Sequence, residues 1–317
     1  MNQRQGAPPD LDLAESPQPR YMARMRLTFT DSLLDHAGLQ RANPDWMAQQ
    51  HVHAEGRAVL FAGGSIALAD DGAPLVLPAG IASGLALKWP GLIFIGLQNG
   101  APWFAGALEN GVAERGPDFR MTAMQLAPEL ACVFGRARSI LMWSGRRRFC
   151  SNCGSKNEFF DGGLRLTCPS CGMEHYPRTD PSIILLPYSG DRCVMGRQPS
   201  WPPGMYATLA GFVEPGETLE AACARETAEE VHLKVLSTEY VANQPWPFPS
   251  ALMIGFLAEV EDGEVQPDDD LEDARWFTRD EVRELYDGAM ANWAPRHFSI
   301  SRLLIERWLG RDDGATL

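Results

Sequence analysis

Three glutamates of one predicted helix are the residues whose spacing most clearly indicates chemistry. Glu226, Glu229 and Glu230 fall within residues 218–231, where apolar residues recur at helical spacing. One turn apart, their carboxylates share a helix face and repel one another by roughly a few tenths of a kcal/mol per pair. A divalent cation reverses this penalty, because hard ions such as Mg²⁺ prefer carboxylate, water and phosphate oxygens. The spacing therefore predicts a cation site.

The residues around this helix are suited to holding the carboxylates in place. Gly211 and Gly216 permit a tight loop before the helix, and Pro215 stiffens it. Arg225 can form a bidentate pair with a carboxylate, for which Glu217 is the candidate. The helix also has an apolar side, formed by Leu219, Ala222, Cys223 and Val231. The alternative is therefore an ordinary amphipathic helix with a solvated acidic face.

Four cysteines form two C-x-x-C pairs separated by 14 residues: Cys150, Cys153, Cys168 and Cys171. Four thiolates fill the tetrahedral coordination of zinc and leave no open position, so the predicted zinc is structural. The surrounding residues 146–178 are too few to bury a core, and metal binding would replace one. The alternative is two chance pairs of reduced core cysteines. Burial as small apolar residues is expected for Cys132, Cys193 and Cys223.

The predicted zinc module is locally basic. Its cations are Arg146, Arg147, Arg148, Lys156, Arg165 and Arg178. Its acids are Glu158, Asp161 and Glu174. Zinc ribbons also bind nucleic acid, so this patch is a candidate contact surface for it.

Residues 243–250 alternate three prolines with two aromatic residues. Such a segment can form neither a helix nor a central strand, so we expect it to be extended, with rigid rings. Rigid aromatic rings suit the binding of planar bases. The alternative is an aromatic edge that packs on the core.

Two larger domains flank the zinc module. Apolar runs at 57–62, 85–89 and 92–97 predict strands, and Asn99-Gly100 predicts a hairpin turn before 103–105. Helical spacing at 128–143 predicts a helix that leads out of this domain.

The C-terminal part mixes both types of element. Predicted strands there are 181–186, 192–196, 252–259 and 274–277, and predicted helices are 218–231 and 300–309. The predicted organisation is a tail (1–20), a β-rich domain (21–145), a zinc ribbon (146–178) and an α+β domain (179–317). The two large domains could share a fold without visible sequence identity.

Composition limits the class of protein. The chain has 317 residues, with 28 Lys and Arg against 41 Asp and Glu, a formal net charge of −13. This charge counts against broad binding of duplex nucleic acid. No run approaches the about 20 apolar residues that span a bilayer, and residues 1–20 lack the features of a signal peptide. Seven cysteines, an odd number, favour a reduced compartment, which we take to be the cytoplasm.

The full spacing around the glutamate helix resembles the box of the Nudix hydrolases, G-x5-E-x7-R-E-U-x-E-E-x-G-U, where U is a bulky aliphatic residue. The matching residues are Gly211, Glu217, Arg225, Glu226, Glu229, Glu230 and Leu233. Thr227 replaces an aliphatic residue and His232 replaces a glycine, so His232 must adopt the left-handed conformation that glycine usually provides. The resemblance implies a C-terminal α/β/α Nudix sandwich with a mixed sheet.

The resemblance also implies roles for individual residues. Hydrolysis of a nucleoside diphosphate would depend on Mg²⁺ or Mn²⁺ and on the catalytic residues Glu217, Arg225, Glu226, Glu229 and Glu230, with Glu229 as the candidate base. The ligands of the catalytic metal would be the Ala210 carbonyl, Glu226, Glu229, Glu230 and Asp270. Asp270 stands where the family has Glu, and Glu272 is an alternative ligand.

Residues 244–249 resemble the S-Q-P-W-P-F-P-x-S motif of the NADH pyrophosphatase branch of this family, with Asn243 and Ala251 in place of its serines. The branch shares an N-terminal domain, a zinc ribbon and a Nudix domain, and it acts as a homodimer. The implied substrate contacts are Tyr176, Phe212, Gln244, Pro245, Trp246, Pro247, Phe248, Pro249, Ser250, Ala251 and Ser301.

The resulting hypothesis is a metal-dependent enzyme that cleaves NADH or NAD⁺ into AMP and nicotinamide mononucleotide. One alternative keeps the chemistry and removes an NAD cap from the 5′ end of RNA, guided by the basic ribbon. Another is a zinc-ribbon regulator whose Nudix domain senses a nucleotide without turnover.

Overall fold

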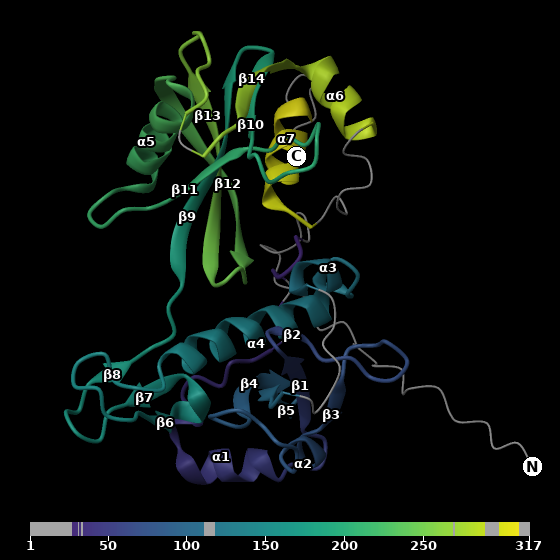
Figure 1. Cartoon of the computed structure of the whole chain (residues 1–317), viewed down its shortest axis with the longest axis vertical. Coiled ribbons are helices and arrows are strands. Elements are labelled where there is room, and N and C mark those ends of the chain that lie inside the picture. The colour runs from purple at the N-terminus through teal and green to yellow at the C-terminus, as the bar shows by residue number, and fades with distance from the viewer. Residues whose placement is uncertain are drawn as a thin grey trace, which may run out of the picture.

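The computed structural model describes residues 27–30, 32, 34–110, 118–268, 270–288 and 298–310. The predicted tail, 1–20, lies outside these residues. Two larger bodies stack along the long axis, and a small three-stranded module lies at the side of the lower one (Figure 1). No helix in the described ranges is long and apolar enough to cross a membrane.

The N-terminal domain is built on a sheet of strand order β2-β1-β5-β4, with β3 paired to β1. Its strands are β1 (Arg57–Ala62), β2 (Ser65–Ile66), β3 (Val76–Pro78), β4 (Ile93–Gln98) and β5 (Ala101–Leu108). Its helices are η2 (Gln40–Ala42), α1 (Pro44–His51), α2 (Ala79–Ala82), α3 (Phe119–Ala123) and α4 (Pro128–Arg146). The predicted hairpin is confirmed: Asn99 and Gly100 join β4 to β5 with φ of 51° and 83°, as a primed turn requires.

The predicted strand at 85–89 is wrong. In that segment only Leu87 forms a bridge, to Leu108 at the end of β5. The segment lies between the end of α2 and the turn at Pro90 and Gly91. It therefore reaches only the last residues of the neighbouring strand β5.

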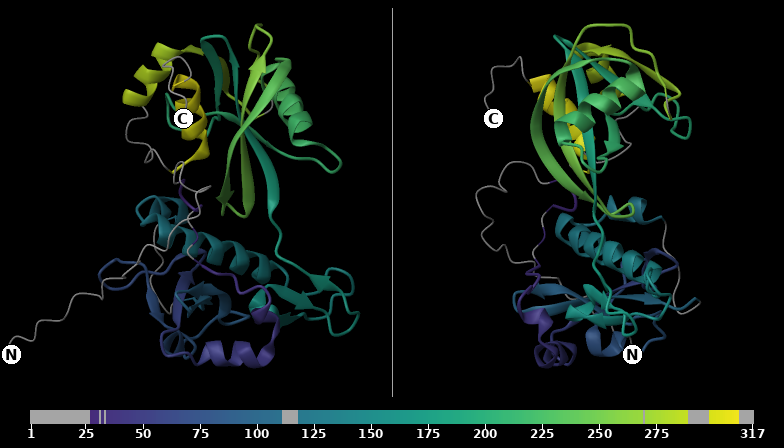
Figure 2. Two further views of the ribbon diagram at one scale, coloured as in Figure 1. Left: turned by 180° about the vertical axis from the view of Figure 1, so that it is seen from behind. Right: turned by 90° about the vertical axis from the view of Figure 1, so that its left-hand side faces the viewer.

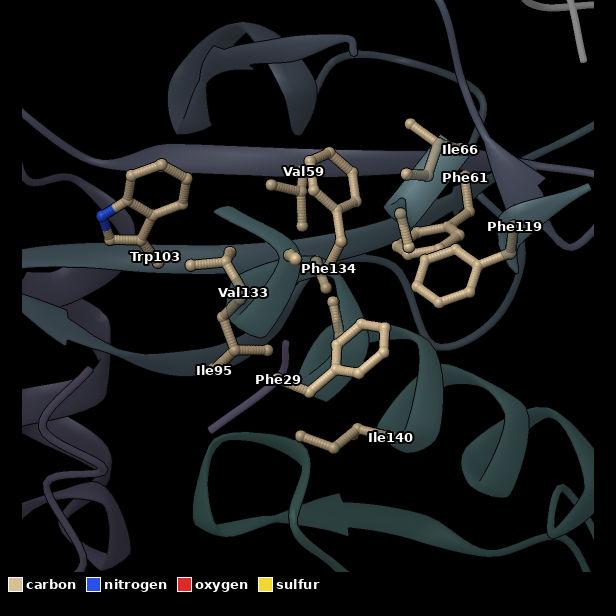
Figure 3. Close-up of a cluster of buried hydrophobic side chains, with 14 of the residues drawn as sticks. Phe29, Val59, Phe61, Ile66, Ile95, Trp103, Phe119, Val133, Phe134 and Ile140 are labelled. Carbon is tan, nitrogen blue, oxygen red and sulfur yellow. The ribbon is translucent and has the colours of Figure 1, made fainter. Parts of the chain in front are cut away.

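Helix α4 closes the core of this domain. Its buried Val133, Phe134 and Ile140 pack against the sheet residues Val59 and Ile95 (Figure 3). The predicted helix at 128–143 is therefore confirmed, and it extends to Arg146. The helix also lies against the C-terminal body, so it connects the two domains (Figure 1).

The small module has strand order β6-β7-β8, formed by β6 (Glu158–Phe160), β7 (Arg165–Thr167) and β8 (Glu174–His175), with η3 (Asp161–Gly163) between the first two. It contributes only a few buried apolar residues, such as Leu166. The stabilisation expected from a bound metal is consistent with so small a core.

The C-terminal domain is a mixed sheet between helices, as predicted. The sheet has strand order β12-β13-β9-β10-β14, with β11 paired to β9, and β13 runs parallel to β9. Its strands are β9 (Asp180–Ser189), β10 (Arg192–Arg197), β11 (Leu209–Phe212), β12 (Val235–Trp246), β13 (Ala251–Val260) and β14 (Asp273–Thr278). Its helices are α5 (Leu219–Val231), α6 (Arg279–Asp287) and α7 (Ile300–Leu309).

Two apolar clusters fill the two faces of this sheet. Residues such as Ile183, Leu185 and Ala222 join the sheet to α5. Residues such as Leu186 and Leu304 join the opposite face to α7 (Figure 2). Alternate residues of β9 thus point to opposite clusters, as the period of two in a strand requires.

Candidate active site

Helix α5 carries the three glutamates and has well-defined ends. The Thr218 hydroxyl accepts a hydrogen bond from the Ala221 amide at 3.2 Å and caps the N-terminus. At the other end His232 has φ of 59°, so the predicted left-handed conformation is confirmed. Thr227 is fully buried, and its hydroxyl donates to the Cys223 carbonyl at 2.7 Å. The two departures from the glycine and aliphatic pattern are therefore accommodated locally.

Arg225 holds the carboxylates of the site together. Its Nε and one terminal nitrogen donate to the two oxygens of Glu217 at 2.9 and 3.0 Å, so the predicted bidentate pair is present. The other terminal nitrogen donates to Glu226 at 2.8 Å and Glu229 at 3.0 Å. The hydrogen bonds between Arg225 and Glu217 lower the pKa of Glu217. The same hydrogen bonds are the largest cause that raises the pKa of Arg225. Arg225 thus offsets part of the charge of three carboxylates and fixes their directions.

Glycine at position 211 is required by the carboxylate of Glu226. A Cβ atom at that position would lie 1.8 Å from the Glu226 carboxyl carbon. The carboxylate therefore rests directly on the backbone of β11, one residue from Ala210. Only 9% of Glu226 is exposed, so α5 and β11 hold this group between them.

The oxygen donors of α5 fit a hard divalent cation. Glu226 is buried, Glu230 is half-buried and Glu229 is exposed, and the donor chemistry is carboxylate throughout. Bound here, such a cation would neutralise phosphate charge. Residues 266–268 lie against the end of α5, since the Asp268 amide donates to the Glu230 carbonyl at 3.0 Å.

Asp270 follows this contact by two residues in the chain and is exposed. The alternative ligand Glu272 instead pairs with Arg197.

Gln244 has a structural role in place of the predicted substrate contact. Its side chain has no exposed surface. Its amide nitrogen donates to the carbonyls of Thr28 and Phe298 at 2.8 and 2.9 Å, and its oxygen accepts from the Ile300 amide at 2.9 Å. Through these hydrogen bonds the Gln244 side chain joins β12 to the segment around Thr28 and to the start of α7.

The expectation that residues 243–250 are extended throughout is wrong for 247–250. β12 continues to Trp246, which pairs with Ala251, and the four residues between form the turn of a hairpin. β12 is an edge strand, as the prolines require.

Trp246 and Phe248 pack on the core of the N-terminal domain. This packing is the alternative to base binding that the sequence left open. Their rings lie 4.9 Å apart, and both contact Phe29, at 6.3 and 6.1 Å between centroids. The guanidinium of Arg120 lies 5.1 Å from the Trp246 ring and 5.5 Å from the Phe248 ring. The aromatic residues therefore join the two domains, and neither ring is free on both faces for a base.

A pocket of about 360 Å³ lies where α4, the hairpin turn and residues 177–179 meet. Five residues of the proline and aromatic motif line this pocket: Pro245, Trp246, Pro247, Ser250 and Ala251. Arg136 and Arg178 supply positive charge. Sequence reasoning missed Arg136, whose only signal was a cation among the apolar positions of α4. The pocket brings together five of the predicted substrate contacts.

The remaining predicted contacts differ in exposure. Tyr176 is 58% exposed and Phe212 is 61% exposed, so both rings are available to a ligand. The Tyr176 hydroxyl donates to Glu174 at 2.7 Å. Pro249 is exposed at the hairpin turn. Ser301 is buried, and its hydroxyl bonds with that of Thr208 at 2.9 Å, so it supports α7 and does not present a free surface.

The four paired cysteines converge as predicted. Their sulfur atoms all lie within 4.8 Å of one another, with 3.7 Å between Cys150 and Cys171 and 3.4 Å between Cys153 and Cys168. Tetrahedral bonds of about 2.3 Å place sulfur atoms about 3.8 Å apart, so the cluster fits zinc. No other group of three or more such ligands is that close in the described part of the chain. Cys132, Cys193 and Cys223 are buried, as expected.

Comparison with known families matches three segments. A model described as NUDIX domain matches residues 178–302. A model described as NADH pyrophosphatase-like rudimentary NUDIX domain matches 55–143, and one described as NADH pyrophosphatase zinc ribbon domain matches 146–176. The expectation that both large domains could share one fold therefore has support in the family descriptions.

Curated relatives carry the name NAD-capped RNA hydrolase. The NudC protein of Pseudomonas syringae is 37% identical over 225 residues, covering 70% of this chain and 78% of the relative. NudC of Stutzerimonas stutzeri is 43% identical over 61% of this chain and 67% of its own. Human NUDT12 is 43% identical over 59% of this chain and 43% of its own. The chain spans 63% of the NudC proteins of Pseudomonas aeruginosa.

Among solved structures, a NUDIX hydrolase from Nitrosomonas europaea is 26% identical and covers 53% of this chain and 93% of its own, with a TM-score of 0.43.

Proposed function

Because the chain belongs to the Nudix hydrolase family, in the branch that joins an NADH pyrophosphatase-like domain to a zinc ribbon, we propose that it hydrolyses the pyrophosphate of NADH or NAD⁺. Water attacks one phosphorus, the bond from that phosphorus to the bridging oxygen breaks, and AMP and nicotinamide mononucleotide leave. The observation that carries the proposal is the set of three carboxylates, Glu217, Glu226 and Glu229, that pair with Arg225 at α5.

The site residues divide the work between charge and position. Glu226, Glu229 and Glu230 would hold a catalytic Mg²⁺ or Mn²⁺, with the Ala210 carbonyl and Asp270 completing the donors. Glu229 is exposed, and among the described residues only Arg225 anchors its carboxylate, so it is the residue we propose to take the proton of the attacking water.

We propose that the substrate lies between the exposed rings of Tyr176 and Phe212 and the pocket at the hairpin turn. Aromatic faces bind a planar base, and the cations Arg136 and Arg178 suit the negative charge of a dinucleotide. We also propose a homodimer in the cytoplasm, where reduced thiols can bind zinc.

The second candidate function is removal of an NAD cap from RNA. It is favoured by the names of the relatives and by the ribbon cations Arg147, Arg148 and Lys156, which form no ion pair with the described residues. The bond that breaks is the same, so the substrate alone differs. A nucleotide sensor without turnover is a weaker alternative, since no carboxylate of the box is missing.

Purified protein with Mg²⁺ or Mn²⁺ is expected to release AMP from NADH, and Glu229→Gln to lower kcat by about 10²–10⁴-fold. Unchanged turnover in Glu229→Gln would refute the assigned base. Tight NAD⁺ binding in the presence of metal without AMP release would favour the sensor.

Free NADH and NAD-capped RNA are then compared at two salt concentrations. Only binding of RNA releases many counterions, so kcat/KM for the capped RNA alone is expected to fall steeply with salt.

A further inference from the structure

The turn of the β12–β13 hairpin lies against the N-terminal domain. Residues 247–250 form this turn, and the end of the hairpin reaches α4 (Figure 1). Arg138 of α4 donates a hydrogen bond from a terminal nitrogen to the Pro247 carbonyl. The Ser139 hydroxyl donates to the Pro249 carbonyl at 3.5 Å. Two consecutive residues of α4 thus hold two carbonyls of the turn.

Two aromatic rings and a glycine strengthen this contact. The Arg138 guanidinium lies 5.5 Å from the Phe248 ring of the turn and 5.1 Å from the Phe119 ring of α3. Gly135 permits the close approach of α4, since a Cβ atom there would lie 3.3 Å from a side-chain carbon of Pro247. A guanidinium is attracted to aromatic rings most strongly where water is excluded, and Arg138 is half-buried. Arg138 is therefore suited to fix the turn.

The same contact shapes the pocket of about 360 Å³. From α4 the pocket is lined by residues that include Gly135 and Ser139, and from the hairpin by residues that include Pro247 and Ser250. Because the lining comes from both domains, the width of the pocket depends on the distance between them. The hydrogen bond from Arg138 to the turn helps to set this distance.

The turn lies far from the glutamate helix across the C-terminal sheet. Paired residues of β11, β9, β13 and β12 form one row: Gly211, Ile183, Ile254 and Asn243. The Glu226 carboxylate rests on Gly211, and Trp246 begins the turn three residues beyond Asn243. At about 4.8 Å per strand and about 3.3 Å per residue, the turn lies roughly 14 Å across the sheet and about 10 Å along it from Gly211. A change in the turn should therefore affect substrate binding and leave the reacting phosphorus in place.

We propose that Arg138 is a positioning residue through which the N-terminal domain holds the substrate pocket in its binding shape. It acts through the Pro247 carbonyl and the Phe248 ring, away from the reacting atoms. The part of the substrate in this pocket is remote from the bond that breaks, so the N-terminal domain sets the affinity for substrate and not the rate of the chemical step. This role deepens the proposed hydrolysis and rests on it.

Steady-state kinetics of the full-length protein with NADH at saturating Mg²⁺ tests this role. Arg138→Ala is expected to raise KM about tenfold and to keep kcat within about twofold, because a loss of binding shared by substrate and transition state changes KM alone. Arg138→Lys keeps a cationic donor for the Pro247 carbonyl, so its KM should stay within about threefold of that of the unmodified protein. A KM as high in Arg138→Lys as in Arg138→Ala would overturn the proposal, and so would a loss confined to kcat.

The matched control is Arg279→Ala on the C-terminal domain. Arg279 is also half-buried, donates to the Trp308 carbonyl at 2.7 Å, and lies 4.4 Å from the Trp308 ring. Both alanine variants should lower the Tm, because each loses a hydrogen bond and a cation–π contact. Only Arg138→Ala should raise KM. An equal rise in Arg279→Ala would refute positioning and indicate a general loss of stability.

Hydrogen exchange of the segment 246–252 is a readout that needs no activity. Within the turn the Phe248 amide donates to the Trp246 carbonyl at 2.8 Å. Exchange in this segment is expected to be about tenfold faster in Arg138→Ala and unchanged in Arg279→Ala, because only the first variant frees the turn. An unchanged rate in Arg138→Ala would refute the proposal. If the unmodified protein does not hydrolyse NADH, the proposed function fails, and exchange still decides whether Arg138 holds the turn.

Discussion

Replacing Gly211 with alanine would place a methyl group where the Glu226 carboxylate now lies. The new Cβ would be 1.8 Å from the carboxyl carbon, and ordinary contacts begin at 3.4 Å, so the carboxylate must withdraw by about 1.6 Å. A misplacement of about 1 Å in a catalytic group can cost about 10²-fold in rate. We therefore expect kcat to fall at least about 100-fold, equivalent to about 2.7 kcal/mol in the activation free energy.

Folding should suffer much less, because the displaced atoms end a flexible side chain and Gly211 is not in the left-handed region. The assay is AMP release from NADH at saturating Mg²⁺, with the Tm measured in parallel. Gly145→Ala is the control, since a Cβ there meets no atom within 4 Å. If Gly211→Ala keeps more than a third of the kcat of the unmodified protein, the carboxylate does not need its present position and the reasoning fails.

Three further predictions test other parts of the structure. Gln244→Leu leaves two carbonyls and one amide without their partner in a buried region, so the free energy of unfolding should fall by about 2–4 kcal/mol in denaturant titration; a loss below 0.5 kcal/mol would contradict the structural role. Arg225 keeps the pKa of Glu217 below 4.5, so this pair stabilises the fold above that pH and the benefit is lost as the pH falls through the lowered pKa. The Tm difference between the unmodified protein and Glu217→Gln should therefore be present at pH 7 and shrink below pH 4.5, and a constant difference would argue against the ion pair. Removal of zinc by a chelator should expose four thiols to a thiol reagent and raise KM for NADH, because Tyr176 follows the ribbon; an unchanged KM would separate the ribbon from substrate binding.

Much of the site could be predicted because its residues lie close together in the chain. A helix fixes the relation of Glu226 to Glu230, and a short loop limits how far Glu217 can lie from Arg225, so local spacing was sufficient for both. The paired cysteines follow the same logic, since each C-x-x-C turn places two sulfur atoms together before any packing occurs.

The errors came where packing between distant segments decides. The proline and aromatic pattern of 243–250 is equally compatible with an exposed platform and with a joint between domains. The position of Phe29, more than 200 residues earlier in the chain, decides between them by packing on Trp246 and Phe248. The strand expected at 85–89 was wrong for a similar reason. A strand needs a neighbouring strand whose backbone groups are free to pair along its whole length, and this segment reaches only the end of β5.

The sequence by itself determined the chemistry that this protein holds: oxygen donors on one helix, four thiolates for zinc, and the type of each large domain. These follow from residue type and from periods of two or four residues, which the backbone geometry alone sets. Only the tertiary structure decided which of these groups are free to act. It buried Gln244 and Ser301, left Tyr176 and Phe212 exposed, and brought Trp89 beside Phe159, because exposure depends on which distant segment covers a side chain.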